Sequence, residues 1–372
     1  MKTCVWLMII LAVLFSLLPV QNQGVETSLG GEFWSRWTLE SGKSPVNDDT
    51  IIKKNYFALE RGYFDLRTTF TENTKARFTV DIFSTDLIKD GAGLKLKYAF
   101  VDFANLVPVP DLTLSAGLQK VYFGTIYDWD YTLIGKAPSD EYKLANSADY
   151  GVSFNGYLPA GWGEYALGLY NGEGYKNFGD NLKKNIRMEY LANLRLTPIP
   201  GVTIGGSYMT NSVERENNLA DDTPNPAYQQ QQLLDGVARL AYGPVNVWVE
   251  YLYKHVTFPN AAANDYTATG FMVMPVFSLY PLIGTDIQLV GRYDRWDESD
   301  NPANQNLLNA ITGGINFNTL HNDSFVPALQ VQLNVTQKTY DADNSAAAYA
   351  NQKKDALQAM LQLKWRFSSK IK

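Results

Sequence analysis

Two residue types that many catalytic and metal sites need are nearly missing from this chain. Among 372 residues there is one cysteine, Cys4, and there are two histidines, His255 and His321. A disulfide framework needs several cysteines, and a structural zinc site needs four thiolate or imidazole ligands at regular spacing. The composition therefore excludes a disulfide scaffold and a thiolate zinc site.

Long apolar runs are also missing after residue 20, and the mean hydropathy is slightly negative. A transmembrane helix needs about 20 consecutive apolar residues, so a helical membrane protein is excluded. The formal net charge of -6 argues against a general nucleic-acid surface, and we expect no nucleic-acid partner. A large all-β protein, in water or in a membrane, fits what remains.

The one long apolar block runs from Val5 to Val20 and follows Lys2. A basic residue before an apolar block of this length is typical of a secretory signal. We therefore expect residues 1–24 to be a signal peptide, with cleavage near Gly24, and residues 25–372 to form one barrel domain. Because Cys4 would leave with the signal, a cysteine nucleophile is excluded from the mature chain.

Alternation of apolar and polar residues begins near residue 28 and continues to the last strand. Segments of about ten alternating residues recur between short Pro, Gly or Asn turns and longer polar loops, and we count sixteen, with fourteen or eighteen possible. Strands that are apolar on one face and polar on the other are typical of a transmembrane β-barrel, apolar outside and polar inside. The aromatic content of 13% suits the girdles of such a barrel. We predict an all-β antiparallel barrel in a bacterial outer membrane, surrounded by its lipid.

The alternation also assigns single side chains to a face. In the fourth strand, Tyr98 and Phe100 are predicted to face outward, with Lys95 and Lys97 facing inward. Over the whole chain the inward parity collects thirteen basic and eight acidic side chains. The inward residues that we expect to line the barrel interior are Arg36, Arg61, Asp65, Arg67, Arg77, Lys95, Lys97, Arg187, Glu189, Arg195, Arg239, Glu250, Arg292, Lys364 and Arg366.

Several segments resemble the phosphate-selective porin family. They are RGYFDLRTTFTENTKARFTVDIF at 61–83, LKYAFVDF at 96–103, LSAGLQKVYFG at 114–124, LVGRYDRWD at 289–297, ITGGINF at 311–317 and LQAMLQLKWRF at 357–367. The resemblance implies a homotrimer of sixteen-stranded barrels, each with its own pore for small hydrophilic solutes. The arginine and lysine clusters that bind phosphate in the family do not align residue by residue with this chain, so no phosphate site is carried over.

The same resemblance implies that the third extracellular loop folds inward and narrows the pore. The segment from Thr125 to Ala148 occupies that place in the sequence. The residues that we expect at the constriction are Asp128, Asp130, Tyr131, Lys136, Asp140, Glu141 and Lys143. Acidic loop residues opposite a basic wall would set up a transverse field across the pore.

An excess of inward basic residues predicts a weak preference for anions, because a confined channel screens charge less than an open surface does. The alternative is that these residues pair across strands, for instance Arg61 with Asp65 or Arg187 with Glu189, and leave a nearly neutral interior. The sequence does not decide between these two interpretations.

Two other functions are weighed against a diffusion channel. A channel specific for a sugar or an organic acid would stack its solute on inward rings such as Trp34, Tyr157, Trp248 or Trp296, although ordinary pore lining or an aromatic girdle is the better interpretation of these rings. An outer-membrane hydrolase would need a nucleophile beside a base. His255 is predicted at the outer rim with no serine nearby in the sequence, and His321 is predicted in a periplasmic turn with no obvious partner. No motif indicates a cofactor or a metal.

Overall fold

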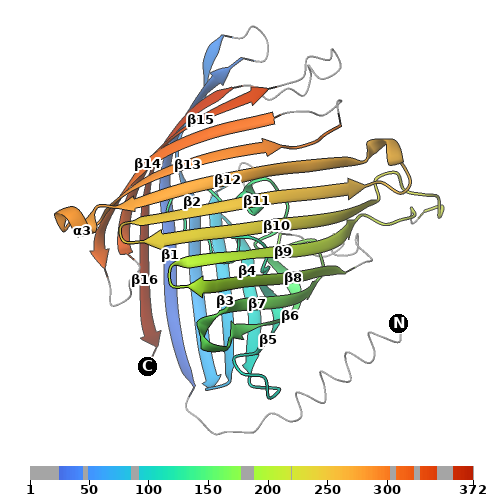
Figure 1. Ribbon diagram of the computed structural model, residues 1–372, viewed down its shortest axis with the longest axis horizontal. Helices are drawn as coiled ribbons and strands as arrows, with labels where there is room; N and C mark the ends of the chain where they lie inside the picture. The colour runs from blue at the N-terminus through green and yellow to red at the C-terminus, as the bar shows by residue number, and fades with distance from the viewer. Residues whose placement is uncertain are drawn as a thin grey trace.

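The structure, a computed structural model, describes residues 25–44, 49–84, 92–176, 188–218, 220–301, 307–321, 327–341 and 355–371. Within these residues sixteen strands form one closed antiparallel barrel, in which each strand pairs with its neighbours in the chain and β1 pairs with β16 (Figure 1). The predicted fold class and strand number are confirmed. The predicted signal peptide, residues 1–24, lies outside the described residues.

The strands vary in length, and the longest are at the two ends of the chain. They are β1 (Glu26–Lys43), β2 (Thr50–Thr71), β3 (Thr74–Ser84), β4 (Ala92–Ala104), β5 (Thr113–Lys120), β6 (Ala148–Leu158), β7 (Gly163–Tyr170), β8 (Glu189–Ile199), β9 (Val202–Val213), β10 (Gln229–Tyr242), β11 (Val245–Thr257), β12 (Tyr266–Ser278), β13 (Ile287–Asp297), β14 (Leu307–His321), β15 (Pro327–Asp341) and β16 (Ala356–Ile371). Short helical turns are η1 (Pro159–Gly161), α2 (Pro138–Glu141), η3 (Ala262–Asn264) and α3 (Tyr280–Ile283). None of the helices in the described ranges is long and apolar enough to span a membrane.

The alternation in sequence becomes two faces of the barrel wall. In β16, Leu361 and Leu363 point outward and are exposed, whereas Gln362 and Lys364 point inward and are buried. Successive side chains of a strand alternate between its two faces, so a period of two in the sequence fixes the direction of each residue. The predicted arrangement, apolar outside and polar inside, is present in this strand.

The alternation fails at β-bulges, where one extra residue shifts the parity of a strand. Between β3 and β4 the pairing passes from Val80↔Leu96 to Thr79↔Tyr98, so that Lys97 is the extra residue. Tyr98 therefore faces inward, where the guanidinium carbon of Arg77 lies 4.4 Å from its ring centroid. The prediction that Tyr98 and Phe100 face outward is wrong, because a pattern of apolar and polar residues does not mark a bulge.

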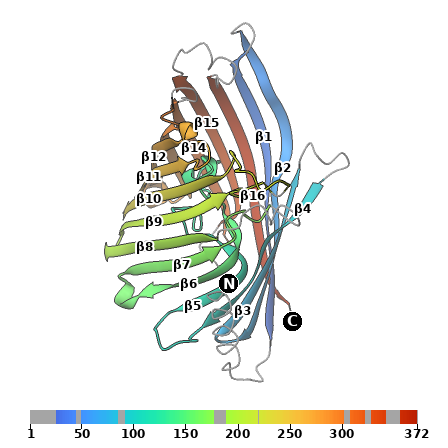
Figure 2. The same cartoon turned by 90° about the vertical axis from the view of Figure 1, so that its right-hand side faces the viewer.

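Two walls face each other across the interior, with β6–β12 on one side and β1, β2 and β16 on the other (Figure 2). The segment between β5 and β6, residues 121–147, enters this interior; we call it the inner loop. Its apolar residues pack on inward apolar residues of β8–β14. The core of the molecule therefore lies between the inner loop and one side of the barrel.

Gly117 in β5 shows how closely neighbouring strands approach. Its φ is +121°, and a Cβ at this position would lie 2.4 Å from the carbonyl oxygen of Ala99 on β4. We predict that Gly117→Val lowers the unfolding temperature of the barrel, because a side chain in this backbone conformation costs about 1–3 kcal/mol in strain. Migration of folded and heated samples on a semi-native gel measures this temperature.

Gly236→Val in β10 is the matched control, because no atom lies within 4 Å of a Cβ at Gly236. We expect its unfolding temperature to stay close to that of the unchanged protein. Equal unfolding temperatures for the two variants would contradict the close approach of β4 to β5.

Candidate functional site

The inner loop is attached to the barrel wall by apolar side chains along its length. Phe123 and Ile126 are buried together with Leu191 of β8, Met209 of β9 and Leu233 of β10. Further along, Leu133 joins a second cluster with the β12 and β13 residues Met272, Met274, Val276 and Val290. These contacts cover the inward faces of β8–β14 and remove apolar surface from the water of the interior.

Inward polar side chains of the same wall bind the backbone of the loop. Arg195 of β8 donates to the carbonyl of Gly124 and, at 2.7 Å, to the carboxylate of Asp128. Arg292 of β13 donates to the Lys136 carbonyl at 2.8 Å and is held by both carboxylate oxygens of Asp294. Buried carbonyl groups need such donors, since water cannot reach them.

Three more strands bind the tip of the loop. Asn316 of β14 donates to the Thr132 carbonyl at 2.6 Å, and Gln332 of β15 donates to the carbonyls of Tyr131 and Thr132 at 3.0 and 3.2 Å. Lys364 of β16 lies 3.3 Å from the Asp130 carbonyl. The tip is therefore fixed at its backbone, and its side chains are free to face the remaining interior.

The start of the loop rests on two carboxylates. Glu250 of β11 accepts hydrogen bonds from the hydroxyl and the backbone N–H of Thr125 at 2.5 and 3.4 Å. A Cβ on Gly124, whose φ is +51°, would lie 2.6 Å from Glu250 Oε1 and 2.7 Å from Asp235 Oδ2. Only glycine allows the loop to approach the wall this closely.

Two cavities lie on the other side of the loop, against β16 and β1–β4. The first, of about 990 Å³, reaches the start of β1 at Ser28 and the end of β16 at Phe367. The short turns of the barrel lie at this end, and outer-membrane barrels have short periplasmic turns and longer extracellular loops, so we call it the periplasmic cavity. The second, of about 720 Å³, reaches Lys53 and Lys338 and is called the extracellular cavity. Among the described residues, Tyr131 is the one that lines both.

Tyr131 is held in place by its backbone and by neighbouring rings. It has a φ of +53°, in the left-handed region, and its ring meets the buried Trp34 ring edge-on at 4.5 Å. The Nζ of Lys364 lies 5.7 Å from the centre of the Tyr131 ring. Burial raises the pKa of the Tyr131 phenol to about 12, so this hydroxyl stays neutral at ordinary pH.

Basic residues outnumber acidic ones in both cavities. The extracellular cavity has eight basic and four acidic lining residues, a formal charge of +4, and the periplasmic cavity has six and four, a formal charge of +2. The basic residues are Arg36, Lys53, Lys54, Arg61, Lys95, Lys136, Lys176 and Lys338 in the first, and Arg67, Arg77, Lys97, Lys120, Lys364 and Arg366 in the second.

Several arginines in the cavities are paired with carboxylates. Arg77 and Arg67 share Asp65 at 2.7 and 2.5 Å, and Arg61 lies 3.9 Å from Asp81. Further ion pairs are Arg36 with Glu60 at 3.2 Å and Arg366 with Glu32 at 2.9 Å. The cross-strand pairing considered from the sequence is therefore present for part of the wall, although with different partners for Arg61.

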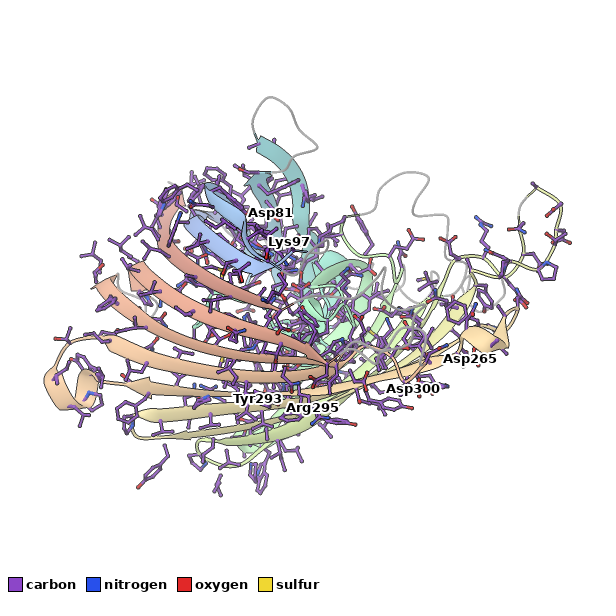
Figure 3. The ribbon with its side chains drawn as sticks, turned by 90° about the horizontal axis from the view of Figure 1, so that it is seen from above. Asp81, Lys97, Asp265, Tyr293, Arg295 and Asp300 are labelled. Atoms are coloured by element: carbon purple, nitrogen blue, oxygen red, sulfur yellow. The ribbon has the colours of Figure 1, made fainter. Side chains whose placement is uncertain are left out.

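Lysines in the cavities are less compensated. Lys95, Lys97, Lys120 and Lys338 have no carboxylate oxygen within 4.0 Å among the residues that the structure describes. Lys97, on β4, lies close to Asp81 on β3 (Figure 3) and also contacts the Ser147 hydroxyl. The positive charge of the cavities thus comes mainly from lysine.

The structure divides the fifteen predicted interior residues into groups. Nine line the two cavities: Arg36, Arg61, Asp65, Arg67, Arg77, Lys95, Lys97, Lys364 and Arg366. Four are buried in the opposite wall, namely Glu189, Arg195, Glu250 and Arg292, and the last three of these hold the inner loop. Arg239 contacts Asn246 and Trp248 on the neighbouring strand. Arg187 lies outside the described residues.

The predicted loop residues also divide by position. Asp130, Tyr131, Lys136 and Glu141 line a cavity, whereas Asp128 binds Arg195 instead. Asp140 lies 3.5 Å from Lys136 in an ion pair. Lys143 is exposed and lines neither of the two cavities. The loop therefore adds less negative charge to the cavities than its sequence suggests.

Several cavity residues were not predicted. Lys53 and Lys54 lie in β2, which begins at Thr50 and brings these lysines to the extracellular cavity. Lys338 follows the inward parity of β15 and could have been found from it. Lys120 is the last residue of β5, and Lys176 follows the end of β7. At such positions the alternation of a strand does not predict which way a side chain points.

The rings proposed to stack on a solute are partly covered by the inner loop. Trp296 is buried and stacks on Tyr142 at 4.8 Å, and Trp34 is buried beneath Tyr131. Trp248 packs beside Leu133, and Tyr157 is exposed at the periplasmic rim.

The histidine weighed for a hydrolase contacts the neighbouring strand. His255 Nδ1 lies 3.3 Å from Thr267 Oγ1 on β12. Within the described ranges no group of His, Cys, Asp and Glu is arranged to hold a metal ion.

Arg195 gives a direct test of how the loop is held. We predict that Arg195→Ala keeps the barrel folded but raises single-channel conductance and its fluctuations, because the variant removes the donor to the Gly124 carbonyl and the ion pair with Asp128. Loss of a hydrogen bond to a buried group costs about 1–3 kcal/mol. Recordings in planar bilayers measure both quantities. Arg239→Ala is the matched control, since Arg239 contacts only its own wall in the described structure. Identical traces for the two variants would contradict the anchoring role of Arg195.

Comparison with known proteins agrees with this architecture. The chain is similar to an anion-selective porin from Comamonas acidovorans (11% identity, 92% of this chain and 100% of that chain, TM-score 0.61). It is also similar to OmpT, an outer membrane protein of Vibrio cholerae solved in a trimer form (13%, 93% and 100%, TM-score 0.58), and to the outer membrane channel DcaP of Acinetobacter baumannii (11%, 92% and 96%, TM-score 0.59). At such low identity these likenesses show the fold alone.

No curated protein matches the sequence significantly. A family model described as phosphate-selective porin O and P matches residues 44–365, which is most of the chain. The chain therefore belongs to the phosphate-selective porin O and P family and is a porin channel of the outer membrane.

Proposed function

We propose that the chain is a passive diffusion channel for small hydrophilic solutes with a weak preference for anions. The observation that carries this proposal is the positive lining of both cavities, which share Tyr131 of the inner loop as a lining residue. Side chains with an excess of one charge raise the local concentration of the opposite ion in a confined channel. The preference is weak because ion pairs compensate most of the cavity arginines.

The distribution of charges in the cavities also allows solutes to pass through without being retained. A channel must attract its solute enough to admit it and bind it weakly enough to release it. Lysines distributed over both cavities, with carboxylates such as Asp81 and Glu60 between them, give many moderate contacts in place of one tight site. No catalytic step is part of the proposal, and the family points to a channel instead of an enzyme.

Two further parts of the proposal concern the mature protein. We infer that residues 1–24 are removed on export and that residues 25–372 form the barrel, with the exposed apolar side chains of its strands facing lipid. A homotrimer is proposed from the family and from the trimer form in which OmpT of Vibrio cholerae was solved.

Reversal potential in a KCl gradient across a planar bilayer tests the selectivity. We predict a sign that corresponds to chloride preference, and a cation-selective potential would contradict the proposal.

Lys95→Glu should reduce the ratio of anion to cation permeability, because Lys95 lines the extracellular cavity without an ion-pair partner in the described structure. The expected reduction is about two- to fivefold, since a screened charge contributes roughly 0.5–1 kcal/mol. Lys370→Glu is the control of equal charge change, as Lys370 lies at the end of β16 beside Glu26 and away from both cavities. Equal shifts for both variants would show that overall charge, and not the cavity lining, sets selectivity.

A further inference from the structure

The turn between β12 and β13 exposes large apolar side chains on a helical turn. Tyr280, Leu282 and Ile283 of α3 are 60%, 66% and 57% exposed. Figure 1 shows α3 projecting at the end of these two strands. Exposed apolar clusters of this kind usually mark a contact with a membrane or a partner.

The turn is fixed, so these side chains are held outward by the backbone. Ile283 N–H donates to the Leu279 carbonyl at 3.1 Å, and Gly284 N–H donates to the Tyr280 carbonyl at 2.9 Å. Gly284 ends the turn in the left-handed conformation, with a φ of +69°. At the other end, Leu279 N–H donates to the Ile287 carbonyl at 2.8 Å, which ties the turn to the start of β13.

Two other turns on the periplasmic side differ from this one. The turn between β2 and β3 carries Glu72 and Asn73, and the turn between β10 and β11 is Gly243-Pro244. By contrast, residues 279–285 read LYPLIGT and carry no charge. Burial of the apolar side chains of residues 279–285 away from water would be favourable.

The exposed residues of α3 continue the outward surface of the barrel. On β12 and β13, Phe277 pairs with Leu289, and Leu289 is exposed on the outer face. The turn between β10 and β11 lies beside α3, because Ser278 N–H donates to the Pro244 carbonyl at 2.8 Å. Tyr242, the last residue of β10, is 83% exposed next to this turn. Aromatic residues at such a rim sit at the level of the lipid headgroups.

We propose that α3 is an interfacial anchor in the periplasmic leaflet of the outer membrane, with Leu282 and Ile283 among the lipid chains and Tyr280 at the headgroups. The proposal rests on the outer-membrane location of the porin and not on its ion selectivity. Lipid is the occupant that the geometry favours, because the apolar turn is continuous with the exposed apolar outer surface of β12 and β13.

Spin labels at single cysteines test this placement in liposomes of phosphatidylethanolamine and phosphatidylglycerol. Cys4 is the only cysteine of the sequence and leaves with residues 1–24, so Leu282→Cys, Ile283→Cys and Glu72→Cys each give the mature barrel a single cysteine. Glu72 is the control, since it is exposed in the polar turn between β2 and β3. For each label, collision with oxygen, which concentrates in lipid, is compared with collision with a water-soluble nickel complex.

We expect labels at 282 and 283 to collide at least threefold more with oxygen than with the nickel complex, relative to the label at 72. Accessibility to nickel equal to that at position 72 would place the turn in water and overturn the proposal. Protection of 282 and 283 from both reagents would also overturn it, because a protein surface would then cover the turn. Unchanged conductance of the labelled variants confirms that the barrel is folded in each measurement.

Discussion

The rest of the structure depends on the hydrogen bonds between the backbone of the inner loop and inward side chains of the barrel wall. A long segment with little secondary structure cannot satisfy its own carbonyl groups, and inside a barrel it has limited water to help. Arg195, Arg292, Asn316 and Gln332 supply the missing donors. The loop is fixed on the wall of β8–β14. The open space therefore lies between Tyr131 and the opposite wall, which is formed by β16 and β1–β4.

This division changes what a charged residue of the interior does. On the side covered by the loop, Arg195 and Arg292 are buried and bind carboxylates and carbonyl groups, so they stabilise the loop. On the open side, Lys95 and Lys338 face the cavity and act on its contents. Two basic residues of equal inward parity thus have different roles, and the difference follows from which wall the loop covers.

The barrel could be predicted from the sequence because strand geometry makes apolar and polar residues alternate with a period of two in each strand of the wall. This alternation predicted Arg36, Arg77 and Lys364 on the inner face, and all three line a cavity of the interior. It failed for Tyr98, because the extra residue Lys97 changes the parity without changing the composition of the strand.

The position of the inner loop could not be read from local pattern at all. Its contacts join Phe123 and Leu133 to strands that lie far along the chain, and only the closed barrel brings these residues together. The family resemblance supplied the inward direction of the loop, but not the wall on which it rests. Glu250 was expected in the pore because the alternation of β11 shows its inward direction but not that the loop covers this wall. It lies beneath the loop and accepts a hydrogen bond from Thr125.

The central claim is that solutes reach only the side of the interior that the loop leaves open. Reaction of single cysteines with a small charged thiol reagent, followed as a change in current, tests this most directly. The account predicts that a cysteine at Lys95 or Arg366 reacts quickly, whereas a cysteine at the fully buried Met272 is protected. Equal rates of reaction at all three positions would contradict it.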